Sequence, residues 1–193
     1  MRGRLALALG GLALVAGAAE PEGASRAMKR ATGALQEIAV PEVPLVRDDG
    51  KEVTLPSELK DGRPVVLTFI FTKCGTICPV MSQTFARLQT HFAEHHQPVH
   101  LVSISIDPEY DTPARLAEYA SKVRAGPQWH FYTGTVEASV AAQRAFAAFR
   151  GDKMSHTPVT FLRAEGSERW ERVDGFASPD ELLGELHRLL ARR

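Results

Sequence analysis

The sequence predicts an α/β domain with a central mixed β-sheet, flanking helices and an N-terminal β-hairpin. Two observations predict this fold class. Between residues 65 and 149, short apolar runs alternate with segments of helical periodicity, which is typical of successive β–α units with parallel strands. Two further apolar runs, joined by a short turn and followed by an amphipathic segment, predict an antiparallel hairpin and a closing helix, so the sheet is mixed.

Residues 1–18 predict a secretory signal peptide. The chain starts with basic residues, continues with the apolar stretch 5–15 and reaches small residues at 16–18 that suit a cleavage site. The apolar part is shorter than the roughly 20 residues that span a bilayer. We therefore expect cleavage and export to the periplasm or another oxidising compartment. A retained leader would instead anchor the protein to the membrane.

Composition bounds the domain count and the partners. Small and charged residues dominate 19–37, which predicts a linker, and residues 38–193 are enough for one domain with a sizeable core. Lys and Arg together number 23, as do Asp and Glu. This balance gives no electrostatic basis for binding nucleic acid, so we expect no such partner.

The first part of the domain predicts a hairpin, a strand, a helix and a second strand. Residues 43–46 and 52–55 flank an Arg-Asp-Asp-Gly-Lys turn, which predicts the hairpin. The apolar run 65–71 predicts a buried strand. A helix is expected from about residue 79 to 95, because its apolar residues recur on one stripe, and the run 99–106 predicts the next buried strand.

The middle part predicts two more helices around a short strand. Asp111 or Thr112 is expected to cap a helix over residues 113–123, because both residue types are favoured at this position and proline is favoured directly after it. For Asp107 and Asp111, turn and capping roles are expected in preference to supporting or docking roles at a functional site. A short strand follows at 129–132, and the Ala-rich segment 135–149 predicts a helix.

The C-terminal part predicts a hairpin and a last helix. Residues 159–162 and 169–173 pair through an Ala-Glu-Gly-Ser turn. The last helix has the clearest start in the chain: Ser178 is the expected N-cap, Pro179 takes the first helical position and Glu181 completes a capping box before a leucine-rich stripe.

The chain has two cysteines, Cys74 and Cys78, and they directly follow the predicted strand 65–71. The N–H groups and the dipole at the start of a helix stabilise a thiolate, so this pair is suited to react or to bind a metal. Both sulfurs would lie near one face of the first helical turn, within reach of a shared ion or of each other. A purely structural disulfide is less consistent with this spacing, because so small a loop removes little chain entropy.

The order of the predicted elements resembles the thioredoxin fold. In that fold the redox cysteines open the helix after a central strand, and a cis-proline before a later strand lies against them. Pro158 stands in the corresponding place before strand 159–162, and we expect its bond with Thr157 to be cis. The same placement would bring His156 beside the thiols, where an imidazole completes a soft three-ligand metal site.

The remaining candidate ligands fit structural roles better. His91 and His95 have the i, i+4 spacing of a metal pair, but no third ligand lies near them in sequence, so we expect them to form a solvated helix face with His96. Met81 is expected in the core and Met154 in solvent. Three further histidines have no partner in the sequence: His100, His130 and His187.

Three segments, 68–74 with Cys78-Pro79, 105–113 and 155–157, resemble in order the signature blocks of the Sco/SenC family. The resemblance extends from about residue 38 to the C-terminus. It implies a thioredoxin-like protein that binds one copper ion, Cu(I) or Cu(II), through Cys74, Cys78 and His156. It also implies delivery of copper to the dinuclear copper centre of cytochrome c oxidase, or reduction of its cysteines. The implied partners are a copper donor, an oxidase subunit and a thiol reductant.

The same residues are compatible with functions other than copper delivery. Two thiolates and one imidazole suit Cu(I) and hold Cu(II) with an added ligand, but zinc accepts the same set, so the preference for copper comes from the resemblance. A thiol-disulfide oxidoreductase that uses Cys74 and Cys78 without stored metal is the alternative interpretation. A peroxiredoxin-like peroxidase is excluded, because Thr68 stands where the proline of that family's pattern would lie relative to Thr72.

Overall fold

The computed structural model describes residues 35–192. The predicted signal peptide over 1–18 and most of the predicted linker over 19–37 lie outside the described residues. Within 35–192, no helix has the length and apolar character needed to cross a membrane.

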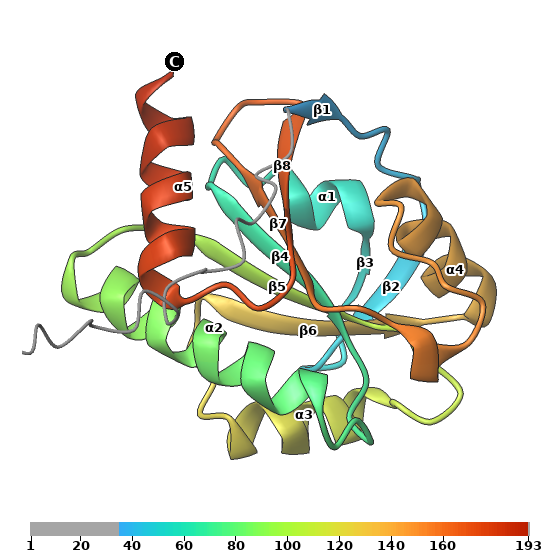
Figure 1. Cartoon of the computed structure of the whole chain (residues 1–193). Helices are drawn as coiled ribbons and strands as arrows, with labels where there is room; N and C mark the ends of the chain where they lie inside the picture. Colours follow the sequence, from blue (N-terminus) through green and yellow to red (C-terminus); the bar gives the residue numbers. More distant parts are fainter. Residues whose placement is uncertain (1–34, 193) are drawn as a thin grey trace, which may run out of the picture.

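The fold is built on an eight-stranded mixed sheet with the strand order β1-β8-β7-β4-β5-β6-β2-β3. Strands β4, β5 and β6 run parallel, and the other neighbouring pairs run antiparallel. Figure 1 shows the sheet crossing the middle of the molecule. The strands are β1 (Gln36–Glu37), β2 (Pro44–Arg47), β3 (Glu52–Thr54), β4 (Val65–Ile70), β5 (His100–Ser105), β6 (Trp129–Gly134), β7 (Val159–Arg163) and β8 (Arg169–Asp174).

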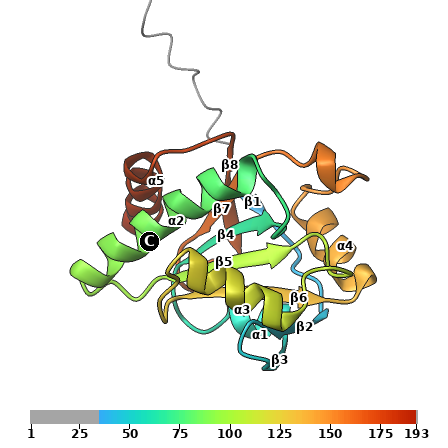
Figure 2. The same cartoon turned by 90° about the horizontal axis from the view of Figure 1, so that it is seen from below.

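Helices cover both faces of the sheet (Figure 1 and Figure 2). They are α1 (Leu55–Leu59), α2 (Ile77–Glu94), α3 (Pro113–Lys122), α4 (Val136–Ala145) and α5 (Pro179–Ala191), with a 3-10 turn η1 (Lys153–Ser155). One apolar cluster joins α2, α3 and α5 to the sheet, and a second joins α1 and α4 to it. The mixed α/β architecture predicted from the sequence is therefore confirmed.

The long predicted elements all occur, with ends shifted by a few residues. On α2, the stripe that includes Phe85, Leu88 and Phe92 is fully buried, as its helical spacing predicts. The capping box of α5 forms between Ser178 and Glu181. Three short elements, β1, α1 and η1, were not predicted, because two to five residues are too few to show a periodic pattern.

The sheet topology brings three loops to one edge. Strands β4 and β5 run parallel, with Ile70 paired to Ser105 at their carboxyl ends. Strand β7 runs antiparallel to β4, so its first residues, such as Thr160 opposite Thr68, lie towards that same edge. The loops that follow β4 and β5 and the segment that precedes β7 therefore meet there.

Candidate metal centre

The two cysteines meet at the start of α2. Cys74 lies in the loop after β4, and Cys78 lies in the first helical turn. Both are free thiols, and the Cys78 N–H donates to the Cys74 sulfur at 3.4 Å. The N-cap residue Thr76 makes no side-chain capping bond. The Cys74 sulfur therefore accepts a hydrogen bond from an N–H at the start of the helix. In most helices a side-chain oxygen of the N-cap residue has this role.

The two thiols differ in acidity and in exposure. Burial opposes the ionisation of Cys74, but hydrogen bonds from Cys78 and Thr76 outweigh it and lower the pKa of Cys74 below its ordinary value. Burial raises the pKa of Cys78 far above its ordinary value, against a hydrogen bond from the Phe71 N–H, and the nearby Cys74 adds to the rise. Cys74 is 8% exposed and Cys78 is 0% exposed. Cys74 is therefore the more acidic and more accessible thiol.

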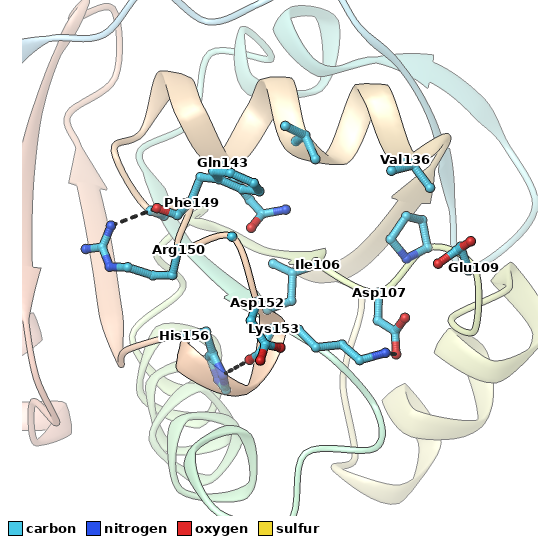
Figure 3. A pocket seen from close by; sticks show the side chains of 14 residues that line it. Ile106, Asp107, Glu109, Val136, Gln143, Phe149, Arg150, Asp152, Lys153 and His156 are labelled. Carbon is cyan, nitrogen blue, oxygen red and sulfur yellow. Dashed lines mark hydrogen bonds and ion pairs between the residues drawn. The ribbon is translucent and has the colours of Figure 1, made fainter.

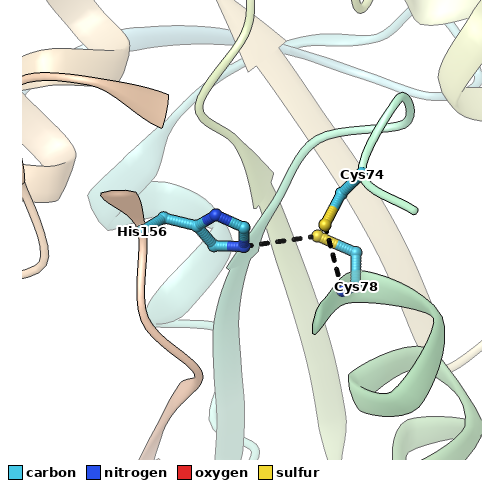
Figure 4. A group of neighbouring side chains, drawn as sticks. All are labelled: Cys74, Cys78 and His156. Atoms are coloured by element: carbon cyan, nitrogen blue, oxygen red, sulfur yellow. Dashed lines mark hydrogen bonds between the residues drawn. The ribbon is translucent and has the colours of Figure 1, made fainter. Parts of the chain in front are cut away.

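His156 approaches the cysteines from the other side of the site. It follows the 3-10 turn η1, which Asp152 caps by accepting a hydrogen bond from the Met154 N–H. Figure 4 shows the imidazole facing the two sulfurs, with Nε2 lying 3.7 Å from the Cys78 sulfur. The ring also packs edge-on against Phe71, with 5.2 Å between ring centroids. The thioredoxin-like placement predicted this proximity.

One atom from each of Cys74, Cys78 and His156 lies within 4.8 Å of the other two. Within residues 35–192, this is the one group of three or more His, Cys, Asp or Glu side chains close enough to hold an ion. Two metal–ligand bonds of about 2.0–2.3 Å join donor atoms up to roughly 4.6 Å apart, so these atoms need only a small approach to hold one ion. Two sulfurs and one imidazole nitrogen form a soft ligand set, which suits Cu(I) and Zn(II) and disfavours Mg(II) and Ca(II).

The prediction of a cis bond at Pro158 was wrong, because none of the described peptide bonds is cis. The turn η1, followed by extended backbone at His156 with φ −63° and ψ 147°, already directs the imidazole at the cysteines. The loop is also attached to the end of β8, since the Gly175 N–H donates to the Pro158 carbonyl at 2.9 Å. The position of His156 therefore does not require a cis bond before Pro158. The bond takes the trans form, which is favoured by about 0.5–1 kcal/mol at a proline.

Asp111 was one of two predicted caps of α3, but the cap is Thr112, which accepts a hydrogen bond from the Arg115 N–H. Asp111 is instead fully buried behind the cysteine loop. Its carboxylate accepts hydrogen bonds from the Thr72 N–H at 3.1 Å and from the Ser105 hydroxyl at 2.6 Å. Sequence reasoning favoured a turn or capping role for Asp111 over a role in supporting the site, and capping preference alone does not separate adjacent Asp and Thr residues.

The other candidate ligands stay outside the centre. The rings of His91 and His95 stack on each other at 4.1 Å on the last turns of α2, and His95 is exposed, as expected for a solvated face. Met81 is 3% exposed and Met154 is 73% exposed, so the predictions for both are confirmed. His100 has partners that the sequence did not indicate: its Nε2 lies 3.1 Å from the Tyr132 hydroxyl.

The chain is similar to known proteins along most of its length. The family profile described as SCO1/SenC matches residues 32–191. The SCO1 protein homolog of Bacillus subtilis (strain 168) is 38% identical over 93 residues, which make up 48% of this chain and 47% of that protein. The matched region thus spans about half the length of this relative.

Solved structures agree in fold. Arabidopsis thaliana ScoI with copper bound matches with a TM-score of 0.68 at 24% identity, over 80% of this chain and 99% of that chain. BsSco, described as a member of the Sco family of cytochrome c oxidase assembly proteins, matches with a TM-score of 0.68 at 25% identity, over 82% of this chain and 97% of that chain. The fold is the thioredoxin-like fold of Sco proteins. With its family profile covering most of the sequence, the chain belongs to the SCO1/SenC family.

Proposed function

We propose that the protein is an exported copper metallochaperone that holds one copper ion through Cys74, Cys78 and His156. The observation that carries this proposal is the convergence of two sulfurs and one imidazole nitrogen within 4.8 Å. We further propose that it assists assembly of the dinuclear copper centre of cytochrome c oxidase, receiving copper from a donor and passing it to an oxidase subunit. The predicted leader over residues 1–18 supports export.

The environment of the site suits reversible binding of a soft ion. Thiolate ligands select Cu(I), and an imidazole with one added ligand accommodates Cu(II). Cys74 and Cys78 lie in the apolar cluster under α2, which limits access of water to the sulfurs. His156 is only partly buried and stands on a surface loop, so one ligand faces the side from which a donor or a target can approach.

The relatives support this proposal. The Arabidopsis protein that shares the fold was solved with copper bound. BsSco is described as belonging to a family of cytochrome c oxidase assembly proteins.

A thiol-disulfide exchange function is the second candidate, and it uses the same sulfurs. The Cys74 thiolate would attack a disulfide of the target, forming a mixed disulfide and releasing one target thiolate. The Cys78 thiolate would then attack the Cys74 sulfur, forming the Cys74–Cys78 disulfide and releasing the second target thiolate. Two electrons pass to the target, and a thiol reductant restores the dithiol. The greater acidity and exposure of Cys74 favour it as the first nucleophile.

Titration of the reduced protein with Cu(I), in competition with a chromophoric Cu(I) chelator, tests the metal proposal. We expect one copper ion per chain, loss of binding in the double variant C74S/C78S and severely weakened binding in His156→Ala. His187→Ala is the matched control, because His187 is exposed on α5 and outside the ligand set. Stoichiometric copper in C74S/C78S, or unchanged affinity in His156→Ala, would place the metal elsewhere. A parallel titration with Zn(II) measures the preference between the two metals.

A further inference from the structure

We propose that Lys153 is a positioning residue of the metal centre, and that its ion pair with Asp107 holds the imidazole of His156 against the two cysteines. The consequence for copper rests on the proposed function. The consequence for the position of His156 does not, because it is measurable without metal.

The segment that carries His156 is not held by burial. Every residue from Arg150 to Ser155 is exposed, so no apolar side chain of this segment anchors it to the core. Most of its hydrogen bonds are local, such as the one from the Ser155 N–H to the Asp152 carbonyl at 3.0 Å. Within residues 35–192, the contact of Lys153 with Asp107 is the one ion pair or hydrogen bond that joins 150–155 to a distant part of the chain.

This contact is short, and its acidic partner is buried and held at the end of a central strand. The Lys153 ammonium lies 2.7 Å from the Asp107 carboxylate, and the Asp107 side chain is 5% exposed. The Asp107 N–H in turn donates to the Ser105 hydroxyl at 3.0 Å, at the carboxyl end of the central strand β5. The flexible partner of the ion pair is therefore the lysine, and the fixed partner is the aspartate.

The same anchor holds the cysteine loop. The Ser105 hydroxyl that accepts from Asp107 donates to the buried carboxylate of Asp111 at 2.6 Å. Asp111 accepts a hydrogen bond from the N–H of Thr72, two residues before Cys74. Both arms of the candidate centre are thus connected through one chain of polar contacts, and the ion pair of Lys153 is the last link on the histidine side.

Lys153 also sets the orientation of the imidazole directly. Nδ1 of His156 lies 2.8 Å from the Lys153 carbonyl oxygen. Because a carbonyl oxygen can only accept, Nδ1 carries the proton, and Nε2 presents its lone pair to the Cys78 sulfur. Partners of this kind fix the tautomer and direction of a metal-binding histidine. The lysine thus holds the ring through its backbone and is itself held through its side chain.

Figure 3 shows Lys153 extending along a cavity of about 390 Å³ to reach Asp107, with His156 at the margin of the same cavity. Glu109 and Asp152 are the other acidic residues that line this cavity, and Arg150 is the other basic one. The Lys153 side chain is 43% exposed. Because the lysine side of the pair reaches solvent, water can hydrate the Asp107 carboxylate once the ammonium is removed, so we expect Lys153→Met to move the loop without unfolding the domain.

The first arm of the test uses reduced, metal-free protein and NMR. In the parent we expect nuclear Overhauser contacts between the rings of His156 and Phe71, whose centroids lie 5.2 Å apart. We expect these contacts to weaken and the His156 ring resonances to shift in Lys153→Met, and both to be largely restored in Lys153→Arg. Lys60→Met is the matched control, because it removes an exposed ion pair with Glu168 away from the site. Contacts that persist unchanged in Lys153→Met would overturn the proposal.

The second arm measures Cu(I) affinity by chelator competition. Loss of a residue that orients a metal-binding histidine typically costs about 10- to 100-fold in affinity, so we expect a drop of at least about tenfold in Lys153→Met and none in Lys60→Met. Asp107→Asn should give a similar drop, and the double variant should be no weaker than either single variant, because both remove one link. Fully additive losses, or unchanged affinity in Lys153→Met, would contradict the proposal.

The two arms separate this inference from the proposed function. If the parent binds no copper, the metal proposal fails, and the NMR contacts still decide whether Lys153 positions His156. If Asp107→Asn does not fold, the surface variant Lys153→Met and its rescue by Lys153→Arg carry the test alone.

Discussion

Nε2 of His156 lies 3.7 Å from the sulfur of Cys78, although 78 positions of the sequence separate the two residues. Parallel β4 and antiparallel β7 are neighbours in the sheet, so the loop after the first and the segment before the second share one edge. The helix start supplies the sulfurs, and the 3-10 turn supplies the imidazole. This contact between the start of α2 and the segment before β7 is the structural basis of the proposed metal centre.

The two cysteines should react at different rates. We expect iodoacetamide to modify Cys74 at least about tenfold faster than Cys78 at pH 7, since each unit of pKa difference changes the thiolate fraction tenfold. Burial and the neighbouring thiol raise the pKa of Cys78, whereas hydrogen bonds lower that of Cys74. Timed alkylation followed by peptide mass spectrometry measures both rates in one sample. Equal rates, or faster modification of Cys78, would contradict the assignment of Cys74 as the first nucleophile.

Pro158→Ala should leave the centre nearly intact. The bond before Pro158 is trans, which alanine also prefers, and the Pro158 carbonyl that accepts from the Gly175 N–H remains. We expect Cu(I) affinity within a few-fold of the parent and a loss of unfolding free energy of about 1 kcal/mol or less, because the unfolded chain gains freedom. Matched copper titrations and urea denaturation test this. A large loss of affinity would show that the proline ring itself holds the loop.

Stability should fall in acid through His100. Burial, and next the charge of Arg63, lower the pKa of His100 from 6.5 to about 4. The unfolded chain therefore binds more protons than the folded protein between about pH 4 and 6.5, so stability is complete above this window and is lost as the pH falls through it. Complete protonation would remove about 3 kcal/mol from the free energy of unfolding, since each pKa unit corresponds to 1.36 kcal/mol.

Urea denaturation of the parent and of His100→Gln at pH 7, 5.5 and 4.5 measures this linkage. Glutamine does not titrate, so the pH slope of the variant should be flatter, whatever its absolute stability. Parallel slopes for the two proteins would show that His100 does not titrate differently on folding. Asp61 lies 3.2 Å from Nδ1 of His100, and its pKa is lowered in the fold, so it also makes stability fall in acid. The test therefore compares the pH slopes of the two proteins and not their absolute stabilities.

Glu171 should act in the opposite direction at higher pH. This side chain on β8 is 5% exposed, and burial together with the neighbouring Glu185 raises its pKa above the ordinary value. The folded protein therefore holds a proton that the unfolded chain has released. The associated stability is present below about pH 4.5 and is lost as the pH rises through the raised pKa.

We expect Glu171→Gln to remove this loss, so that the variant exceeds the parent by about 1 kcal/mol at pH 8 and not at pH 5. Thermal or urea denaturation at both pH values checks the difference. Glu165→Gln, at an exposed position in the β7–β8 turn, is the matched control. A variant that gains nothing at pH 8 relative to pH 5 would mean that the carboxyl of Glu171 ionises normally in the fold.

The sequence predicted the fold well where the periodicity was long. The buried strand 65–71, the helix after it and the capping box at Ser178 all have local signals, and each occurs in the structure. The resemblance of the element order to the thioredoxin fold predicted that His156 would approach the cysteines. The edge strand β1 and the helix α1 were missed, because segments this short show no hydrophobic periodicity.

The supporting residues of the site were harder to predict, for physical reasons. For Asp111 a turn or capping role was favoured over a supporting one, because the Thr72 N–H that donates to its carboxylate comes from another loop. Nothing in the sequence singled out Lys153, because its partner Asp107 lies 46 positions away. The isomer at Pro158 depends on the shape of the whole loop and not on the dipeptide alone. Tertiary contacts decided all three.

X-ray absorption at the copper edge, on reduced protein loaded anaerobically with one Cu(I) per chain, tests the central claim most directly. The account predicts a first shell of two sulfurs and one nitrogen, with the nitrogen signal lost in His156→Ala and retained in His187→Ala. A shell made of nitrogen and oxygen alone, or a nitrogen signal unchanged in His156→Ala, would contradict a centre built from Cys74, Cys78 and His156.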